Sequence, residues 1–112
     1  MKEQLSWSDF AKVDLRVGTI VEVNDFPNAK RPAYRINVDF GSELGIKKSS
    51  AQITGRYTKE DLLGKQIVAV VNFPKKQIAD FMSECLILGA VGLADVVLIQ
   101  PETGVPNGLK IS

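Results

Sequence analysis

Short runs in which apolar and polar residues alternate dominate this chain, and they predict strands rather than long helices. From 14 to 25, the apolar or β-branched residues at 15, 17, 19, 21 and 23 alternate with their neighbours. We therefore expect one long, half-buried strand with Gly18 as a bend or bulge. From 34 to 40, Tyr34, Ile36, Val38 and Phe40 share one face of a second strand. Prolines bound the FPNAKRP turn, after which this strand is expected to return antiparallel to the first.

The later hydrophobic runs predict three more strands. Residues 44–53 form a weaker and more polar strand, whose face is expected to be solvated or functional. Residues 65–73 are a continuous apolar run, which indicates a strand buried on both faces, and 83–90 are another after a loop over 74–82.

One short helix is predicted between the third and fourth strands. Thr58 and Asp61 have the spacing of a capping box, Leu62 and Leu63 form the apolar side, and Gly64 is the C-terminal stop. Five strands with a helix in this place are the order of an oligonucleotide/oligosaccharide-binding (OB) barrel. The predicted fold class is therefore all-β, a five-stranded OB-fold barrel with short N- and C-terminal extensions.

The two ends of the chain lie outside this barrel pattern. Ser6 and Asp9 are expected to cap a single turn that presents Trp7 and Phe10 inward. Residues 95–100 and 109–111 predict two further short strands. An apolar strand left outside a core is an exposed edge, which a second copy of the chain would cover, so we expect a homodimer. The alternative is that these strands cap the open end of the barrel within one subunit.

Size and composition favour one domain in the cytoplasm. The 112 residues, 45% hydrophobic and 24% charged, suit a single OB-fold domain over 1–112, with a barrel core at about 14–91 and a C-terminal dimerisation extension at about 92–112. The first residues lack the apolar stretch of a signal peptide, and a lone cysteine cannot form an intrachain disulfide. The most apolar run, 85–93, is too short to span a membrane. We expect no membrane insertion.

The absence of histidine and the single cysteine argue for binding rather than catalysis. Acid–base and metal chemistry near neutral pH depends largely on imidazole or thiolate groups, so we expect no catalytic residue, no metal site and no cofactor. Cys85 opens an apolar run and has no imidazole to activate it, which favours a buried, inert thiol over a nucleophile. Asp14 and Arg16 lie on the same side of the first strand, where a structural ion pair is expected.

Positive charge is concentrated in the middle of the chain. The formal net charge is only +1, yet residues 26–76 hold ten Lys/Arg against four Asp/Glu, while the segments before and after carry −2 and −3. Either these cations are ordinary solvated residues, or they form a basic binding face; we favour the binding face.

Five segments resemble the tRNA-binding-domain family. FAKVDLRVGTIVEV, from 10 to 23, is similar to the stretch that forms the first OB strand in that family, and the similarity continues in FPNAKRPAYRINVDFG, SSAQITGRY, VAVVNFPKKQIADFMSE and PNGLKI. The versions SSAQIT and NFP resemble the branch of export-related chaperones in this family. That resemblance implies an OB fold and a free-standing homodimer that binds unfolded or precursor polypeptides.

Departures from the family pattern lie in the basic loop that tRNA-binding members carry. Lys75, Lys76 and Ser83 match that loop, but Asp80 replaces a glycine, and Cys85 with Leu86 replaces Gly-Met. Two expected tRNA contacts are therefore missing or reversed in charge. Polypeptide binding is our main functional prediction, tRNA binding is the alternative, and an enzyme is a distant third.

Polypeptide binding and tRNA binding each predict a set of ligand-contact residues. Aromatic residues at strand ends can receive apolar side chains or stack on bases, and hydroxyl groups can bond a peptide backbone or a phosphate, although they can equally cap neighbouring backbone groups. At least two of the aromatic and proline candidates are expected to be plain core residues. The peptide-binding candidates are Phe40, Ser49, Ser50, Phe73, Pro74 and Phe81. The RNA-binding candidates are Lys30, Arg31, Arg35, Lys75, Lys76 and Ser83.

Overall fold

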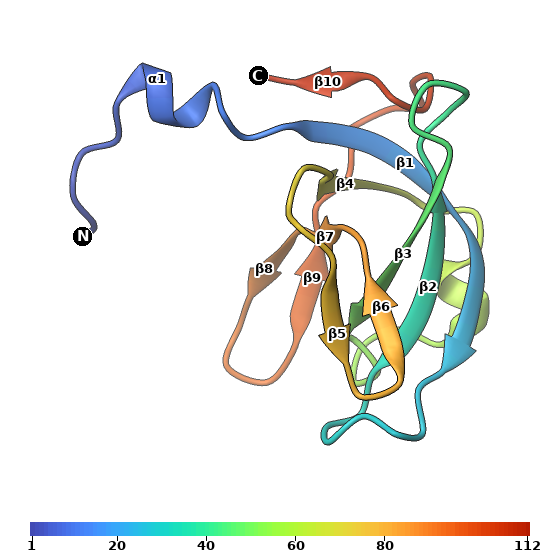
Figure 1. Ribbon diagram of the computed structural model, residues 1–112. Helices are drawn as coiled ribbons and strands as arrows, with labels where there is room; N and C mark the ends of the chain where they lie inside the picture. Colours follow the sequence, from blue (N-terminus) through green and yellow to red (C-terminus); the bar gives the residue numbers. More distant parts are fainter.

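Five strands curl into a nearly closed barrel in the computed structural model, which describes residues 1–112 (Figure 1). They are paired in the order β3-β2-β1-β4-β7. Their bounds are β1 Leu15–Asp25, β2 Tyr34–Asp39, β3 Ile46–Ala51, β4 Gln66–Val70 and β7 Leu86–Ile87. β1 and β2 are antiparallel, as predicted. No helix has the length and apolarity that crossing a membrane would need.

The barrel closes where β3 meets the chain just before β7. The Glu84 backbone N–H donates to the Lys48 carbonyl at 2.7 Å, and the Ser49 hydroxyl donates to the Cys85 carbonyl at 3.0 Å. The short helix α2, Lys59–Leu62, connects β3 to β4 at the predicted place. The predicted OB fold class is therefore confirmed.

The helix α2 begins and ends as the sequence predicted. The Thr58 hydroxyl accepts the Asp61 backbone N–H at 3.1 Å, and the Asp61 carboxylate accepts the Thr58 N–H at 3.0 Å, which completes the capping box. Gly64 follows with a φ of +89°, a conformation that favours glycine. Of the two leucines, Leu62 is buried, whereas Leu63 is 58% exposed, because a helix this short turns only one of them toward the barrel.

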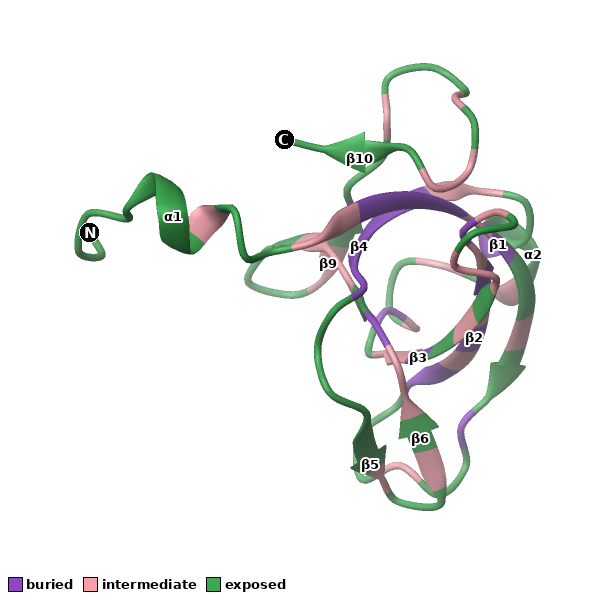
Figure 2. Ribbon diagram, turned by 45° about the horizontal axis from the view of Figure 1, so that its top comes forward, coloured by how far each residue is buried: buried purple, intermediate pink, exposed green.

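The core lies inside the barrel, between β1, β2 and β4 (Figure 2). On β2 the predicted alternation is confirmed, since Tyr34, Ile36 and Val38 are buried and Phe40 continues the same face. β4 is buried on both faces over Ile67–Val70, as its continuous apolar run predicted, although the strand is shorter than 65–73.

The irregularity in β1 lies at Val21 and not at Gly18. The pairing with β2 shifts between Ile20 and Glu22, so one extra residue is inserted there. The bulge exchanges the two faces of the strand, so Ile20 before it and Val23 after it both pack on the core. Val21, between them, is exposed, contrary to the predicted alternation. Gly18 sits in a regular ladder opposite Ile67. A Cβ at Gly18 would lie 2.6–2.8 Å from the side chains of Val38 and Phe40, so the glycine lets these residues pack against the strand.

Arg16 forms the predicted structural ion pair with Asp14. Its Nε donates to Asp14 Oδ1 at 2.7 Å, and its Nη1 donates to the Gly108 carbonyl at 3.1 Å. The Arg16 side chain is buried, so these contacts satisfy a charge that would otherwise be costly to remove from water. They also tie the start of β1 to the segment before β10, Lys110–Ile111, which pairs with β1.

The prediction of one strand over 83–90 is wrong, and so is the prediction of a loop over 74–82. The chain there forms β5 (Lys76–Ile78), β6 (Phe81–Ser83), β7 and β8 (Gly89–Val91). Each piece has a different partner, because β6 pairs with β5, β7 pairs with β4, and β8 pairs with β9 (Val96–Leu98). The chain must turn between these pairings, and it cannot continue as a single strand.

The N-terminal residues form an arm that projects from the barrel (Figures 1 and 2). Ser6 caps the helix α1, Trp7–Phe10, as predicted, by accepting the Asp9 N–H at 3.1 Å. The expectation that Trp7 points inward is wrong, since Trp7 is 90% exposed and no part of the barrel faces it. The base of the arm is held by Asn72, whose side chain donates to the Lys12 carbonyl at 2.7 Å and accepts the Asp14 N–H at 3.0 Å.

Candidate ligand-binding groove

The β5–β6 hairpin stands beside β3 and is held at its tip by the loop between β1 and β2. Asn28 Nδ2 donates to Asp80 Oδ2 at 2.9 Å, and the rings of Phe26 and Phe81 lie 5.4 Å apart at an angle of 59°. Ala79, at the turn of the hairpin, has a φ of 53°. A hairpin fixed at its base and at its tip gives a firm wall to the spaces beside it.

The first of these spaces, which we call the apolar hollow, has a volume of about 670 Å³. Phe73 is 56% exposed and Leu86 is also exposed, so both present apolar area to it. The Lys75 ammonium lies 3.6 Å from Glu84 Oε2, which offsets much of its charge. The hollow is lined by Ser50, Phe73, Pro74, Lys75, Lys76, Gln77, Ile78, Ser83, Glu84, Cys85 and Leu86.

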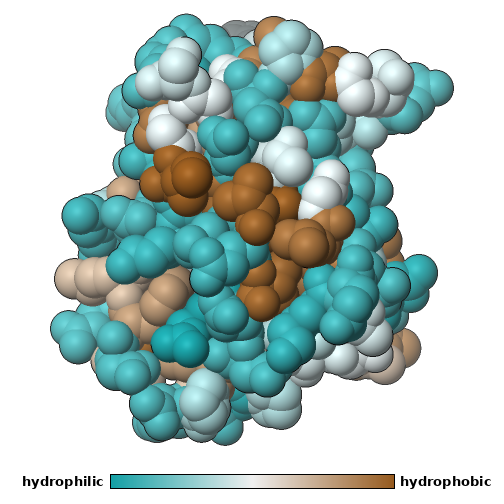
Figure 3. Space-filling view, turned by 90° about the vertical axis from the view of Figure 1, so that its right-hand side faces the viewer, coloured by the Kyte–Doolittle hydropathy of each residue, from teal (hydrophilic) through white to brown (hydrophobic).

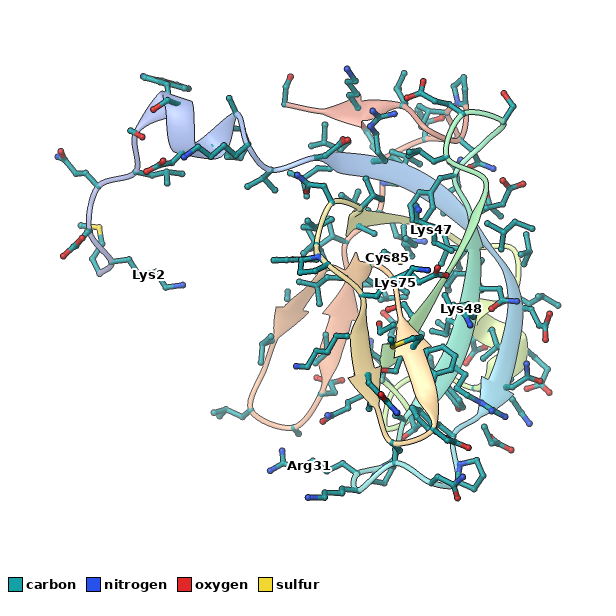
Figure 4. All side chains as sticks on the ribbon, viewed as in Figure 1. Lys2, Arg31, Lys47, Lys48, Lys75 and Cys85 are labelled. Atoms are coloured by element: carbon teal, nitrogen blue, oxygen red, sulfur yellow. The ribbon has the colours of Figure 1, made fainter.

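The second space, which we call the basic hollow, has a volume of about 640 Å³ and lies toward the tip of the hairpin. Three cations line it, Lys30, Arg31 and Lys76, and no carboxylate does. None of the three has a carboxylate within 4.0 Å. Arg31 extends from the loop at the bottom of Figure 4, far from Lys2 on the arm. Its lining residues are Phe26, Asn28, Ala29, Lys30, Arg31, Ala33, Ser50, Gln52, Lys76, Gln77, Ile78 and Ala79.

Cys85 lines the apolar hollow, and its thiol is unreactive. The side chain is buried, as predicted, and its Sγ lies 3.8 Å from the Lys48 carbonyl oxygen. Burial, and after it the charge of Glu84, raises the pKa of the thiol to about 12. The sulfur is therefore a protonated packing atom at neutral pH.

Six of the predicted ligand contacts meet around the apolar hollow. Three come from the peptide-binding set and three from the RNA-binding set, so the two sets share one place in the structure. These residues are Ser50, Phe73, Pro74, Lys75, Lys76 and Ser83. Lys30 and Arg31 line the neighbouring basic hollow together with Lys76.

The other predicted contacts lie elsewhere. Phe40 is 0% exposed and packs in the core, and Ser49 is buried with its hydroxyl bonded to the Cys85 carbonyl, so neither presents its side chain to a ligand. Phe81 packs against Phe26 with the Lys48 ammonium 5.5 Å from its ring centre. Arg35 lies over the Phe26 ring and donates to the Asp25 carbonyl at 3.1 Å. Phe81 and Arg35 therefore pack behind residues that line the basic hollow, and neither lines a hollow itself.

Several lining residues were missed from the sequence, among them Phe26, Gln52, Ile78 and Leu86. The sequence did carry one signal. The short segments KQI and FMS are separated by only two residues, Ala79 and Asp80, which is the spacing of a β-hairpin, and they do pair in the structure. The absence of glycine or asparagine at that turn concealed it.

A third apolar surface lies on the side of the barrel formed by β1 and α2, where Figure 3 shows a hydrophobic band. Val21, Val23 and Leu63 line a smaller hollow of about 280 Å³ there, beside Glu22, Lys59 and Glu60. Charges of both signs give this surface no preference for a ligand of one charge.

Comparison with known proteins identifies the domain. The family model described as "Putative tRNA binding domain" matches residues 15–110. Methionine–tRNA ligase of Thermococcus kodakarensis is 38% identical over 109 residues, and that of Pyrococcus horikoshii is 37% identical over 109 residues. The match covers 97% of this chain but only 14% and 15% of the two ligases, so the chain spans about a seventh of their length.

Two solved structures match nearly end to end. The chaperone CsaA from Bacillus anthracis has a TM-score of 0.93 and 55% identity, with 98% of this chain and 100% of that chain covered. The CsaA chaperone protein from Picrophilus torridus has a TM-score of 0.92 and 51% identity, with 97% and 100% covered. The predicted resemblance of the chain to the chaperone branch of the family is thus confirmed.

Proposed function

Since the chain belongs to the tRNA-binding-domain family, we propose that it is a CsaA-like molecular chaperone that binds unfolded or export-bound polypeptides as a cytoplasmic homodimer. The observation that carries the proposal is the apolar hollow, where Phe73, Pro74, Ile78 and Leu86 line one space beside the hairpin. The likeness to two CsaA chaperones over the whole chain supports the same function.

The apolar hollow suits a polypeptide because it combines apolar area with local hydrogen-bonding groups. Phe73 and Leu86 are exposed, so a ligand that covers them gains the free energy of removing apolar surface from water. Ser50, Gln77 and Ser83 offer donors and acceptors that can pair with a peptide backbone. Hydrogen bonds to the backbone are available to any extended chain, while the apolar area favours segments that bring an apolar side chain.

We propose binding without turnover. The thiol of Cys85 is held in its neutral form by burial, and the carboxylate nearest the hollow, Glu84, is engaged by Lys75 and by the Lys48 N–H. Reversible capture of a chain needs none of the activated nucleophiles or acid–base pairs that covalent catalysis requires.

The homodimer is supported by apolar surface that one subunit leaves uncovered. β10 and the buried Leu98 do contribute within the subunit, in part as the alternative arrangement predicted. The arm, the end of β8 and the C-terminal extension nevertheless expose many large apolar side chains, more than solvated surface alone explains. These are Leu5, Trp7, Val13, Val91, Leu93, Val97, Ile99, Leu109 and Ile111. Light scattering at micromolar concentration should give the mass of two chains; a monomer would contradict the proposal.

The test of polypeptide binding uses two matched variants. Phe73 and Leu63 have nearly equal exposure, 56% and 58%, but only Phe73 lines the apolar hollow. Phe73→Ala should weaken binding of labelled dephosphorylated casein, an unfolded chain, by about tenfold, whereas Leu63→Ala should leave it unchanged. The loss should persist at high salt because apolar contacts are not screened. Equal effects of the two variants would remove the apolar hollow from the proposal.

Binding of tRNA is the second candidate, and the basic hollow favours it. Lys30, Arg31 and Lys76 carry charge that no carboxylate within 4.0 Å offsets, and the ligase relatives share this domain. Each phosphate contact should contribute about −0.7 to −0.9 to the slope of log K against log salt. Lys30→Ala with Arg31→Ala should flatten that slope by about one to two units. No retention of tRNA at low salt would exclude this candidate.

A further inference from the structure

The two hollows form one groove along a strand that has a free edge. Ser50, Lys76, Gln77 and Ile78 line both hollows, so the hollows adjoin at β5. β5 pairs with β6 along one edge and has no strand partner along the other. A free strand edge presents backbone N–H and C=O groups in the spacing that an extended polypeptide can match.

Charge is distributed unequally along this groove. At the end near Phe73 and Leu86, these two exposed side chains present apolar area, and the single acidic lining residue Glu84 lies 3.6 Å from Lys75. Lys76 lines this end as well as the other. At the end near the hairpin tip, Lys30, Arg31 and Lys76 have no carboxylate within 4.0 Å, and none lines the space. A ligand that fits both ends has an apolar part and an anionic part.

We propose that the preferred client segment is an extended polypeptide that carries acidic residues beside an apolar one, and that it adds a strand to the free edge of β5. Its apolar side chain enters the apolar hollow, and its carboxylates meet Lys30 and Arg31 in the basic hollow. This inference rests on the polypeptide binding proposed above and specifies the client that the site selects.

The geometry favours a polypeptide over RNA at this groove. An unpaired strand edge is completed by a peptide backbone, which supplies N–H donors and C=O acceptors in strand register. The ribose–phosphate backbone of RNA has its acceptors and 2′-hydroxyl groups at a different spacing. RNA also carries a charge at every nucleotide, so it would place phosphates beside the exposed Phe73 and Leu86, where they gain nothing from the apolar surface. A peptide can place its acidic residues at one end alone.

The test uses three labelled extended peptides with the same Leu-Phe centre, flanked by Glu, by Gln or by Lys. Fluorescence anisotropy with the full chain should give the tightest binding for the Glu peptide and the weakest for the Lys peptide, about tenfold apart at low salt. Lys30→Ala with Arg31→Ala should weaken the Glu peptide about fivefold, the size expected for two exposed ion pairs, and leave the Gln peptide unchanged. The control Lys65→Ala removes a cation beside α2, outside both hollows, and should change none of the three.

The outcomes separate this inference from the function it rests on. Equal binding of the three peptides, or tightest binding of the Lys peptide, overturns the acidic preference and leaves polypeptide binding intact. Failure of all three peptides and of casein removes the proposed function and the inference together. Strand addition has its own readout: replacing the peptide backbone N–H groups by N-methyl groups at alternate positions should abolish binding of the Glu peptide, and retention of full affinity would refute it.

Discussion

Phe40 and Phe73 each lie just beyond a central strand of the barrel, and they end in opposite environments. Phe40 follows β2 and is 0% exposed, whereas Phe73 comes three residues after β4 and is 56% exposed. After Phe40 the chain turns at Gly41 and returns over the barrel as β3, so the ring stays inside. After Phe73 the chain leaves the barrel to build the hairpin. The path of the following segment, and not the residue type, decides whether an aromatic ring is buried in the core or left exposed beside the hairpin.

Truncating the buried ring should have the largest effect on stability. Phe40→Ala should reduce the free energy of unfolding by about 3–5 kcal/mol, since the lost ring leaves a cavity beneath Gly18 and Val38. Urea denaturation at one fixed protein concentration measures this difference. A loss below about 1 kcal/mol would mean that the core collapses onto the vacated space and that the two phenylalanines differ less than their exposure indicates.

This contrast also separates what could be predicted from the sequence from what could not. β2 and β4 were predictable from the sequence. β2 is buried on one face and so alternates apolar and polar residues, and β4 is buried on both faces and so is a continuous apolar run. The bulge at Val21 was not, since one inserted residue leaves no local signature.

The candidate site was predictable in its residues more than in its shape. Phe73, Lys75 and Lys76 were found from the basic, aromatic segment of the sequence, and they do line the groove. Phe40 was misplaced because strand ends look alike in sequence. The exposure of Trp7 could not be predicted, because the capping pattern of Ser6 and Asp9 indicates where a helical turn begins and not what packs against it.

Trp7 offers the next largest effect, as an exposed ring that the proposed homodimer would bury. Trp7→Ala should weaken dimerisation by about 2–4 kcal/mol, or roughly 30-fold to 1,000-fold in the dissociation constant, if the ring is an interface anchor. Sedimentation or light scattering over a dilution series measures the shift. A dimer of unchanged affinity would place Trp7 outside the interface and leave its exposure unexplained.

Gly18→Ala tests the packing of Phe40 in the opposite way, because it crowds the buried ring instead of removing it. The added Cβ would lie within 2.6–2.8 Å of Val38 and Phe40, so those side chains must shift. Overpacking of this kind should cost about 1–3 kcal/mol of unfolding free energy. In the double variant with Phe40→Ala, the penalty of the extra methyl group should shrink. If the two variants lower the free energy of unfolding additively, the methyl group added at Gly18 does not clash with Phe40.

The cap of α2 should contribute less to the free energy of unfolding than the packing of Phe40, which the Phe40→Ala and Gly18→Ala variants disturb. Thr58→Ala removes the hydroxyl that accepts the Asp61 N–H and should cost about 1 kcal/mol. Hydrogen bonds from Thr58 lower the pKa of Asp61, so the carboxylate contributes stability above its unfolded pKa and loses it as the pH falls through the lowered folded value. The free energies of unfolding of wild type and Asp61→Asn, measured in urea, should therefore converge as the pH falls through the lowered pKa of Asp61. A constant difference would mean that the charge of Asp61 is not what the cap uses.

Phe73→Ala should have the smallest effect on folding, and for that reason it is the sharpest test of the contrast with Phe40. An exposed ring outside the core contributes little to folding, so the free energy of unfolding should change by no more than about 0.5 kcal/mol. Leu63→Ala, with nearly the same exposure, should behave alike in urea. The two variants should then differ only in peptide binding, where Phe73 lines the apolar hollow and Leu63 does not. If Phe73→Ala instead unfolds as readily as Phe40→Ala, its ring belongs to the packed structure, and the separation between a folding end and a binding end of the barrel is wrong.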